Sequence, residues 1–275
     1  MKKYYFILFS TLLCACSANK KLPDTIGDQK NAVSFGYQPI DPLPVKIEYR
    51  DKKFKDSLTS LNKINSHLMS SLPDETMRLA IGQIDTKGDI SFATAKTGYA
   101  GSSYIVILDY IKFDTKSLEV QIKKNEKGEV TDFRLYDFYA SEIKVPDAII
   151  PMYIGVGLRF TATITVNEGS IDLGNLFAIG VAAESKKVTG TLLIQTLGIS
   201  GKDISSLIPM PSQINPTTIQ NAIMSLAAIK AKIYENDIDI NPRVVGFYNN
   251  IGGQGTAQKF ISGVMTRGVF LSIKH

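Results

Sequence analysis

The fold is decided by one stretch that reads Met152-Tyr153-Ile154-Gly155-Val156-Gly157-Leu158-Arg159-Phe160-Thr161-Ala162-Thr163-Ile164-Thr165-Val166-Asn167. Its even-numbered residues are all apolar, whereas its odd-numbered residues are polar, glycine or tyrosine. Because side chains alternate between the two faces of a strand, this sustained period of two predicts one long strand with one apolar face.

The regions on both sides of this stretch also have strand patterns. Downstream, a turn at 167–170 leads into alternating residues 171–181 and a third strand at 188–197. Upstream, strands are predicted at 77–81, 90–94, 104–113, 118–122 and 130–139, with turn residues at 85–89 and a hairpin at 125–129. Short strands separated by turn residues are typical of an antiparallel meander.

Two helices complete the prediction. Apolar residues at three- and four-residue spacing indicate one amphipathic helix over 54–72, ended by Pro73. A second helix begins after a loop at 209–216, with Asn215 as its cap and Pro216 as its first residue. The chain then continues with a strand at 243–248, a loop at 252–255 and a last strand at 264–273. We therefore expect an α+β fold: antiparallel β-sheets with long amphipathic strands, packed by two principal helices.

Small residues interrupt the predicted strands. Glycine weakens a strand unless another group approaches closely, so these positions predict bulges or packing by the alanine-rich helix at 217–235. The alternative is that strands 152–197 from several subunits line an oligomeric assembly with one face toward lipid. The residues concerned are Gly155, Gly157, Gly174, Gly180, Ala182 and Gly190.

The N-terminus has the pattern of an export signal. Met1-Lys2-Lys3 is positively charged, and the apolar run 4–13 is shorter than the 20 or so residues that a membrane-spanning helix needs. The next residues, Leu13-Cys14-Ala15-Cys16, resemble the lipobox of bacterial lipoproteins. An ordinary cleaved signal peptide with incidental cysteines is the alternative interpretation.

The resemblance implies a lipid anchor. In that family the signal peptide is cleaved between the residues matching Ala15 and Cys16, and the cysteine carries fatty acyl chains such as palmitate on its sulfur and its new amine. Two or more acyl chains give stable membrane anchoring. Ser17, rather than aspartate, follows the cysteine, which by analogy with enteric bacteria implies the outer membrane, facing the periplasm.

The chain is accordingly divided into three parts. Residues 1–15 are the predicted signal peptide, 16–45 a lipidated tether rich in polar and turn-forming residues, and 46–275 an exported α+β domain. A division of this domain into subdomains 46–145 and 146–275 stays open. Cys16 is the only cysteine after the signal peptide, so no disulfide is expected and the core must stabilise the domain.

Composition excludes some partners. The formal charge of +5 falls to +3 once Lys2 and Lys3 are removed, which is too weak to predict nucleic-acid binding. No later apolar run is long enough to predict a transmembrane helix.

The sequence lacks a convincing catalytic motif. Its two histidines, His67 and His275, lie on a predicted helix and at the last position, so no metal site, cofactor or catalytic triad is predicted. Ser60 and Lys63 match Ser-x-x-Lys, but the accompanying motifs of penicillin-recognising enzymes are missing. Gly198–Asp203 lacks the glycine spacing of a phosphate loop, and Gly155-Val156-Gly157 lies inside a strand rather than after one.

Carboxylates are the remaining candidates for acid–base chemistry. Two carboxyl groups must face each other across a cleft to act together, and sequence spacing cannot show this. The candidate pairs are Asp109 with Asp114, Asp137 with Glu142, and Glu168 with Asp172.

These observations favour a non-enzymatic envelope lipoprotein with a binding or structural role, anchored through Cys16 and facing a protein, glycan or lipid partner. An oligomeric outer-membrane export or pore subunit using strands 152–197 is the alternative. An envelope hydrolase using Ser60 and Lys63 is a weaker one.

Overall fold

The computed structural model describes residues 36–49, 51–92, 103–140, 142, 145–167, 188–235, 237–252, 254–265 and 272–274. Its main feature is a ribbon of two long antiparallel strands, β5 (Ser103–Lys124) and β7 (Ala148–Val166). They pair without interruption from Ser103 opposite Thr165 to Val120 opposite Ala148. This pairing joins residues on both sides of position 145 in one sheet.

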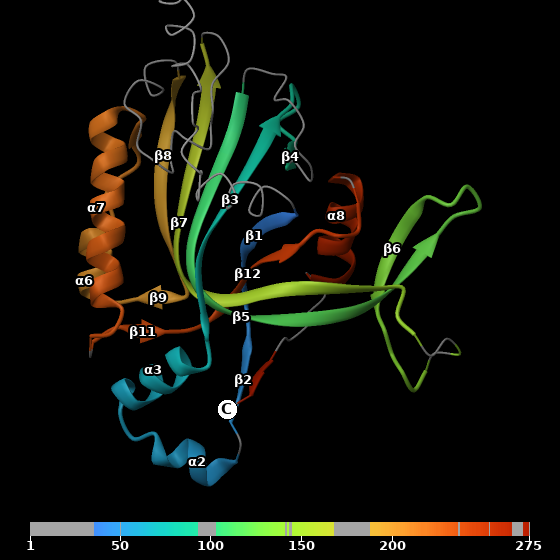
Figure 1. The fold of residues 1–275 in the computed structure, drawn as a ribbon, viewed down its shortest axis with the longest axis horizontal. Coiled ribbons are helices and arrows are strands. Elements are labelled where there is room, and N and C mark those ends of the chain that lie inside the picture. Colours follow the sequence, from blue (N-terminus) through green and yellow to red (C-terminus); the bar gives the residue numbers. More distant parts are fainter. Residues whose placement is uncertain are drawn as a thin grey trace, which may run out of the picture.

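Different strands flank the two ends of this ribbon. At one end β3 (Asp74–Ile84) pairs with β5 and β8 (Val188–Leu197) with β7, while β4 (Ile90–Phe92) and β10 (Ser212–Gln213) lie outside them. At the other end β6 (Val130–Leu135) pairs with β5, and β12 (Arg243–Tyr248) and β1 (Tyr37–Pro44) follow beyond β7. The ribbon bends sharply between its ends, and the sheet wraps into a nearly closed, barrel-like shape (Figure 1). The predicted α+β fold with long antiparallel strands is confirmed.

Two glycines lie at the bend. A Cβ atom on Gly155 would collide with the carbonyl oxygen of Lys112, and one on Gly157 with that of Tyr110, both on β5. The register between β5 and β7 is continuous here, so neither a bulge in this pair nor a packed helix explains these glycines. The neighbouring strand itself approaches too closely for a side chain. Gly190 meets the Thr163 carbonyl in the same way, whereas residues 174, 180 and 182 lie outside the described part.

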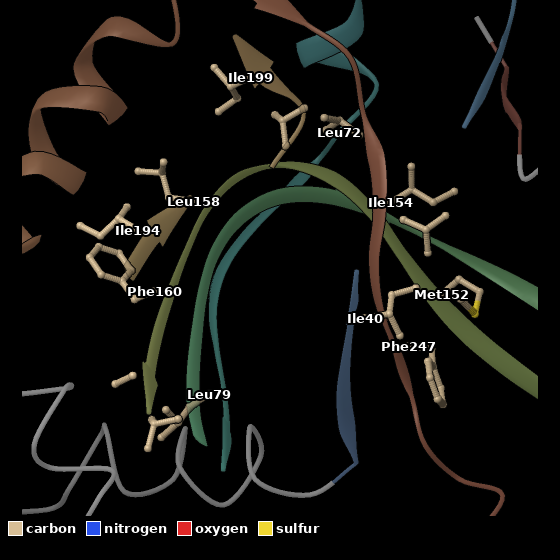
Figure 2. Close-up of a cluster of buried hydrophobic side chains, with 14 of the residues drawn as sticks. Ile40, Leu72, Leu79, Met152, Ile154, Leu158, Phe160, Ile194, Ile199 and Phe247 are labelled. Atoms are coloured by element: carbon tan, nitrogen blue, oxygen red, sulfur yellow. The ribbon is translucent and has the colours of Figure 1, made fainter. Parts of the chain in front are cut away.

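The two faces of β7 have different surroundings. Its even-numbered face packs in the main core with side chains from β8 and from the helices, and Figure 2 shows Leu158, Phe160 and Ile194 in this cluster. Its odd-numbered face, with Tyr153 and Arg159, points into the interior of the curved sheet. Both faces are therefore buried from Met152 to Phe160.

The helices differ partly from the prediction. The predicted second helix is confirmed as α7 (Pro216–Lys232). The Asn215 side chain accepts from the backbone N–H of Thr218 at 3.0 Å, and the Thr218 hydroxyl oxygen accepts from the backbone N–H of Asn215 at 3.0 Å. The single helix predicted over 54–72 is wrong, because the structure has α2 (Lys52–Ser57) and α3 (Leu61–Ser70). Ser60 caps the second of these, which interrupts the helix although the apolar spacing continues.

Further corrections concern the strands and the C-terminal region. The strands predicted at 104–113 and 118–122 are one continuous strand, β5, and β6 ends at Leu135 rather than at 139. The short helix α6 (Lys202–Leu207) was not predicted, nor was α8 (Gln254–Phe260), which begins inside the predicted loop 252–255. A π-helical turn, η1 (Ile261–Met265), replaces the start of the predicted strand 264–273. The predicted strand 171–181 lies outside the described residues.

The remaining strands are short. β13 (Ser272–Lys274) pairs in parallel with β2 (Lys46–Glu48), and β9 (Ile199–Ser200) pairs with β11 (Asp239–Ile240). At the N-terminal side, β1 pairs with β12 through Tyr37 opposite Tyr248, so residues 37–44 belong to the sheet and not to the tether predicted over 16–45. No helix within the described ranges is both long and apolar enough to cross a membrane.

Candidate functional site

A groove lies where the sheet fails to close. β1 and β4 are the two ends of the main strand order, and a cavity of about 880 Å³ is lined by both of them, by β5 behind them, and by α8 and η1. This volume falls in the range of small-molecule binding sites, roughly 300–1,000 Å³. We call it the edge groove.

Apolar side chains make up most of the wall of the edge groove. Polar residues Gln38, Asp41, Asp89 and Gln258 also line it, together with Arg159 and two glycines, and the exposed carboxylates Asp41 and Asp89 make its mouth acidic. The apolar residues are Ile90 and Phe92 of β4, Ile105 and Ile107 of β5, Pro39, Ile40 and Leu43 of β1, and Ile261 of η1.

Arg159 of β7 lies at the base of the groove and forms a buried ion pair. Its Nε donates to Oδ1 of Asp109 at 2.7 Å and its Nη2 to Oδ2 at 2.6 Å, and the Tyr37 hydroxyl donates to the same Oδ2. Asp109 is fully buried and Arg159 is 4% exposed. Two further guanidinium N–H groups donate to the carbonyl oxygens of Ile40 at 2.7 Å and Val245 at 2.9 Å.

This network joins four strands: β1, β5, β7 and β12. Four of the five N–H groups of the guanidinium are used, so the buried charge is well compensated. Burial opposes the charged form of Arg159, but the hydrogen bonds and charge of Asp109 outweigh it and raise the pKa of the guanidinium. The floor of the edge groove is thus a neutralised ion pair that holds the sheet in its curved shape.

Burial, and then the nearby carboxylate of Asp109, raise the pKa of Tyr37 well above its usual value. The folded protein therefore keeps this hydroxyl protonated when the unfolded chain, with a tyrosine pKa of about 10, already releases its proton. The contribution to stability is complete below about pH 10 and is lost as the pH rises toward the folded-state value.

We expect Tyr37→Phe to lower the free energy of unfolding at pH 7 by about 1.5–3 kcal/mol, the contribution of a hydrogen bond to a charged group. The difference from wild type should shrink at pH 11, since only the wild type loses this contribution there. Urea unfolding at both pH values measures it, with Tyr234→Phe at a 62% exposed position as the control. A difference that grows with pH would contradict the assignment.

The structure gives Ser60 and Lys63 a helix-capping arrangement. The Ser60 hydroxyl oxygen accepts from the backbone N–H of Lys63 at 3.4 Å, at the start of α3. His67, on the same helix, packs edge-on against the Phe54 ring at 4.9 Å between centroids. Gly198–Asp203 forms β9 and the start of α6, and His275 lies outside the described residues.

The candidate carboxylate pairs are not brought together across a cleft in the described part. Asp109 points into the sheet interior, whereas Asp114, an odd number of residues away on the same strand, points to the other face and pairs with Lys116 at 2.7 Å. Asp137 accepts from backbone N–H groups of its own loop, at Tyr139 and Ala140. The pair at 168 and 172 lies outside the described part.

A second polar cluster lies on the outer face. Lys230 of α7 donates to Glu75 of β3 at 2.6 Å and lies 5.0 Å from the centre of the Tyr110 ring, while the Tyr110 hydroxyl also donates to Glu75. These contacts attach α7 to the sheet. They are partly exposed, so their effect on stability is small.

Sequence reasoning missed the edge groove and its buried ion pair. The available signal in the sequence is Arg159, a charged residue on the odd-numbered face of the predicted long strand. The lining of the groove includes no serine, threonine, cysteine, histidine or lysine among the described residues, and no cluster of three or more metal-ligating side chains is found in the described ranges. The described lining offers apolar walls and a few polar side chains, an arrangement that can hold a ligand.

Comparison with protein-family models, with curated proteins and with solved structures found no match to this chain.

Proposed function

We propose that this protein is a lipid-anchored envelope protein. It binds the acyl chain of a lipid in the edge groove and does not catalyse a reaction. The anchor is the acylated Cys16, with residues 1–15 removed, and the location is the outer membrane facing the periplasm. The observation that carries the proposal is the edge groove: its volume is about 880 Å³, apolar side chains from four elements line it, and the charge of Arg159 at its base is neutralised by Asp109.

The charges at the mouth narrow the ligand class. Asp41 and Asp89 are exposed there, and Arg159 is engaged by Asp109, so an anionic head group would be repelled. The groove therefore favours the acyl chain of a zwitterionic or neutral lipid. Each buried methylene group of such a chain would contribute about 0.8 kcal/mol.

Labelling with a photoactivatable lipid tests this proposal. Lipidated protein in detergent would be irradiated with a phosphatidylcholine carrying a diazirine in its acyl chain, and labelled peptides located by mass spectrometry. Label is expected on β4 and β5. Ile90→Lys should reduce it about tenfold, which corresponds to roughly two lost methylene contacts.

Leu193→Lys on β8 is the matched control, since Leu193 is 40% exposed and Ile90 39%, and Leu193 does not line the groove. This variant should label as the wild type does. Equal labelling of the two variants, or label spread over the whole surface, would contradict binding in the edge groove.

The two alternative functions have less support. An oligomeric pore subunit using strands 152–197 needs an apolar strand face free to meet lipid, yet β7 is buried on both faces from Met152 to Phe160 within one chain. A hydrolase using Ser60 and Lys63 would need the Ser60 hydroxyl, which acts as a helix cap.

A further inference from the structure

Beyond the bend, strands β5, β6 and β7 form an arm that projects from the rest of the molecule (Figure 1). Exposed apolar side chains lie at the last residue of β6 and in the chain between β6 and β7, near the end of this arm. Leu135 is 46% exposed, Phe138 59%, Tyr139 96% and Val145 67%. We call these four residues the apolar tip.

The apolar tip is held in place at its root. The Tyr136 N–H donates to the Glu119 carbonyl at 2.9 Å, and the Asp147 N–H donates to the Val120 carbonyl at 3.0 Å. The Asp147 carboxylate also accepts from the Ile122 N–H at 2.7 Å. Both ends of the connection are therefore fixed to β5, which presents the tip on a rigid support.

Two backbone N–H groups of the tip loop are also satisfied within the loop. The Asp137 carboxylate accepts from the backbone N–H groups of Tyr139 at 2.9 Å and Ala140 at 3.3 Å. The rings of Phe138 and Tyr139 pack edge-to-face at 5.7 Å between centroids. Backbone donors satisfied within a loop lower the cost of moving that loop out of water.

We propose that the apolar tip inserts into the interfacial layer of the membrane that carries the lipid anchor. Phenylalanine and tyrosine favour this layer because an apolar ring and a polar hydroxyl are both accommodated there. The inference rests on the proposed acylation of Cys16. Nineteen residues lie between Cys16 and Gly36, the first described residue, and a fully extended segment of this length would span up to about 70 Å. A segment of this length allows the domain to approach the bilayer that holds the anchor.

Insertion would orient the domain relative to the membrane, because it adds a second point of contact to the lipid anchor. Neighbouring Arg134 and Asp137 carry opposite charges, so the contact does not depend on anionic lipid. Zwitterionic membranes should support it as well as anionic ones.

The absence of tryptophan from the sequence allows a direct test. Tyr139→Trp places a single fluorophore on the tip at a 96% exposed position, where the fold tolerates it. Tyr234→Trp, at a 62% exposed position just after α7, is the control, since α7 lies on the far side from the arm (Figure 1). Each lipidated variant would be reconstituted into phosphatidylcholine vesicles with or without brominated acyl chains.

We expect brominated lipid to remove most of the emission of Tyr139→Trp and to leave that of Tyr234→Trp unchanged. No quenching, or a blue shift without quenching, would overturn the inference, the latter indicating contact with a protein or a second copy. The mass of the N-terminal peptide from the same sample separates the two proposals. An acylated Cys16 without quenching contradicts membrane insertion of the tip and leaves the lipid anchor in place. An unmodified Cys16 contradicts the anchor, and the tip proposal falls with it.

Discussion

Asp109→Asn is expected to lower the free energy of unfolding by about 3–5 kcal/mol, the usual cost of removing one partner of a buried ion pair. Asparagine keeps the size of the side chain but removes its charge, so Arg159 would remain buried, 4% exposed, without a counter-ion. A domain of ordinary stability has about 5–15 kcal/mol in total, so the variant should be close to unfolding. Urea unfolding followed by circular dichroism measures the change.

Asp114→Asn is the matched control for this prediction. It is the same substitution on the same strand, but the side chain of Asp114 is 22% exposed and pairs with a partly exposed Lys116. Exposed pairs of this kind contribute about 0–1 kcal/mol. Equal losses in the two variants would show that the buried network does not hold the sheet as described.

Cys16→Ser is expected to abolish acylation completely. Thioether formation needs the cysteine sulfur, and in the lipoprotein pattern cleavage follows acylation, so the variant should also retain residues 1–15. Cells fed an alkyne analogue of palmitate would show labelled wild type and unlabelled Cys16→Ser. Cys14→Ser, two residues earlier, should label normally. Label on Cys16→Ser, or its loss from Cys14→Ser, would contradict the assignment of the lipobox.

The long strand β7 shows what local pattern can predict. Its alternation gave the correct strand and the correct apolar face, because one face packs in the core along its whole length. The same alternation predicts a mainly polar opposite face, whereas Arg159 on that face is buried. Its partner Asp109 lies 50 positions earlier in the sequence, and no local pattern identifies such a pair.

Several element boundaries could not be predicted because tertiary pairing overrides local preference. The polar residues at 114–117 suggested a break, but Thr115 pairs with Tyr153 and Lys116 with Met152, so β5 continues through them. In the same way, proline-rich residues 37–44 were assigned to the tether. Pairing with β12 and burial of Tyr37, which is 3% exposed, place them in the sheet.

The edge groove depends on which strands end the sheet. Ile90 and Ile105 are ordinary strand residues in the sequence, and only the curvature of the sheet brings them into one groove with Ile40 of β1. A groove between elements so distant in sequence follows from topology rather than from any motif.

The mass of the N-terminal peptide of membrane-extracted protein tests the central claim of a lipid-anchored protein most directly. We expect a peptide that begins at Cys16 and carries a diacylglyceryl group on the sulfur and a fatty acyl chain on the amine. A peptide that retains residues 1–15, or one in which Cys16 has a free thiol, would contradict it.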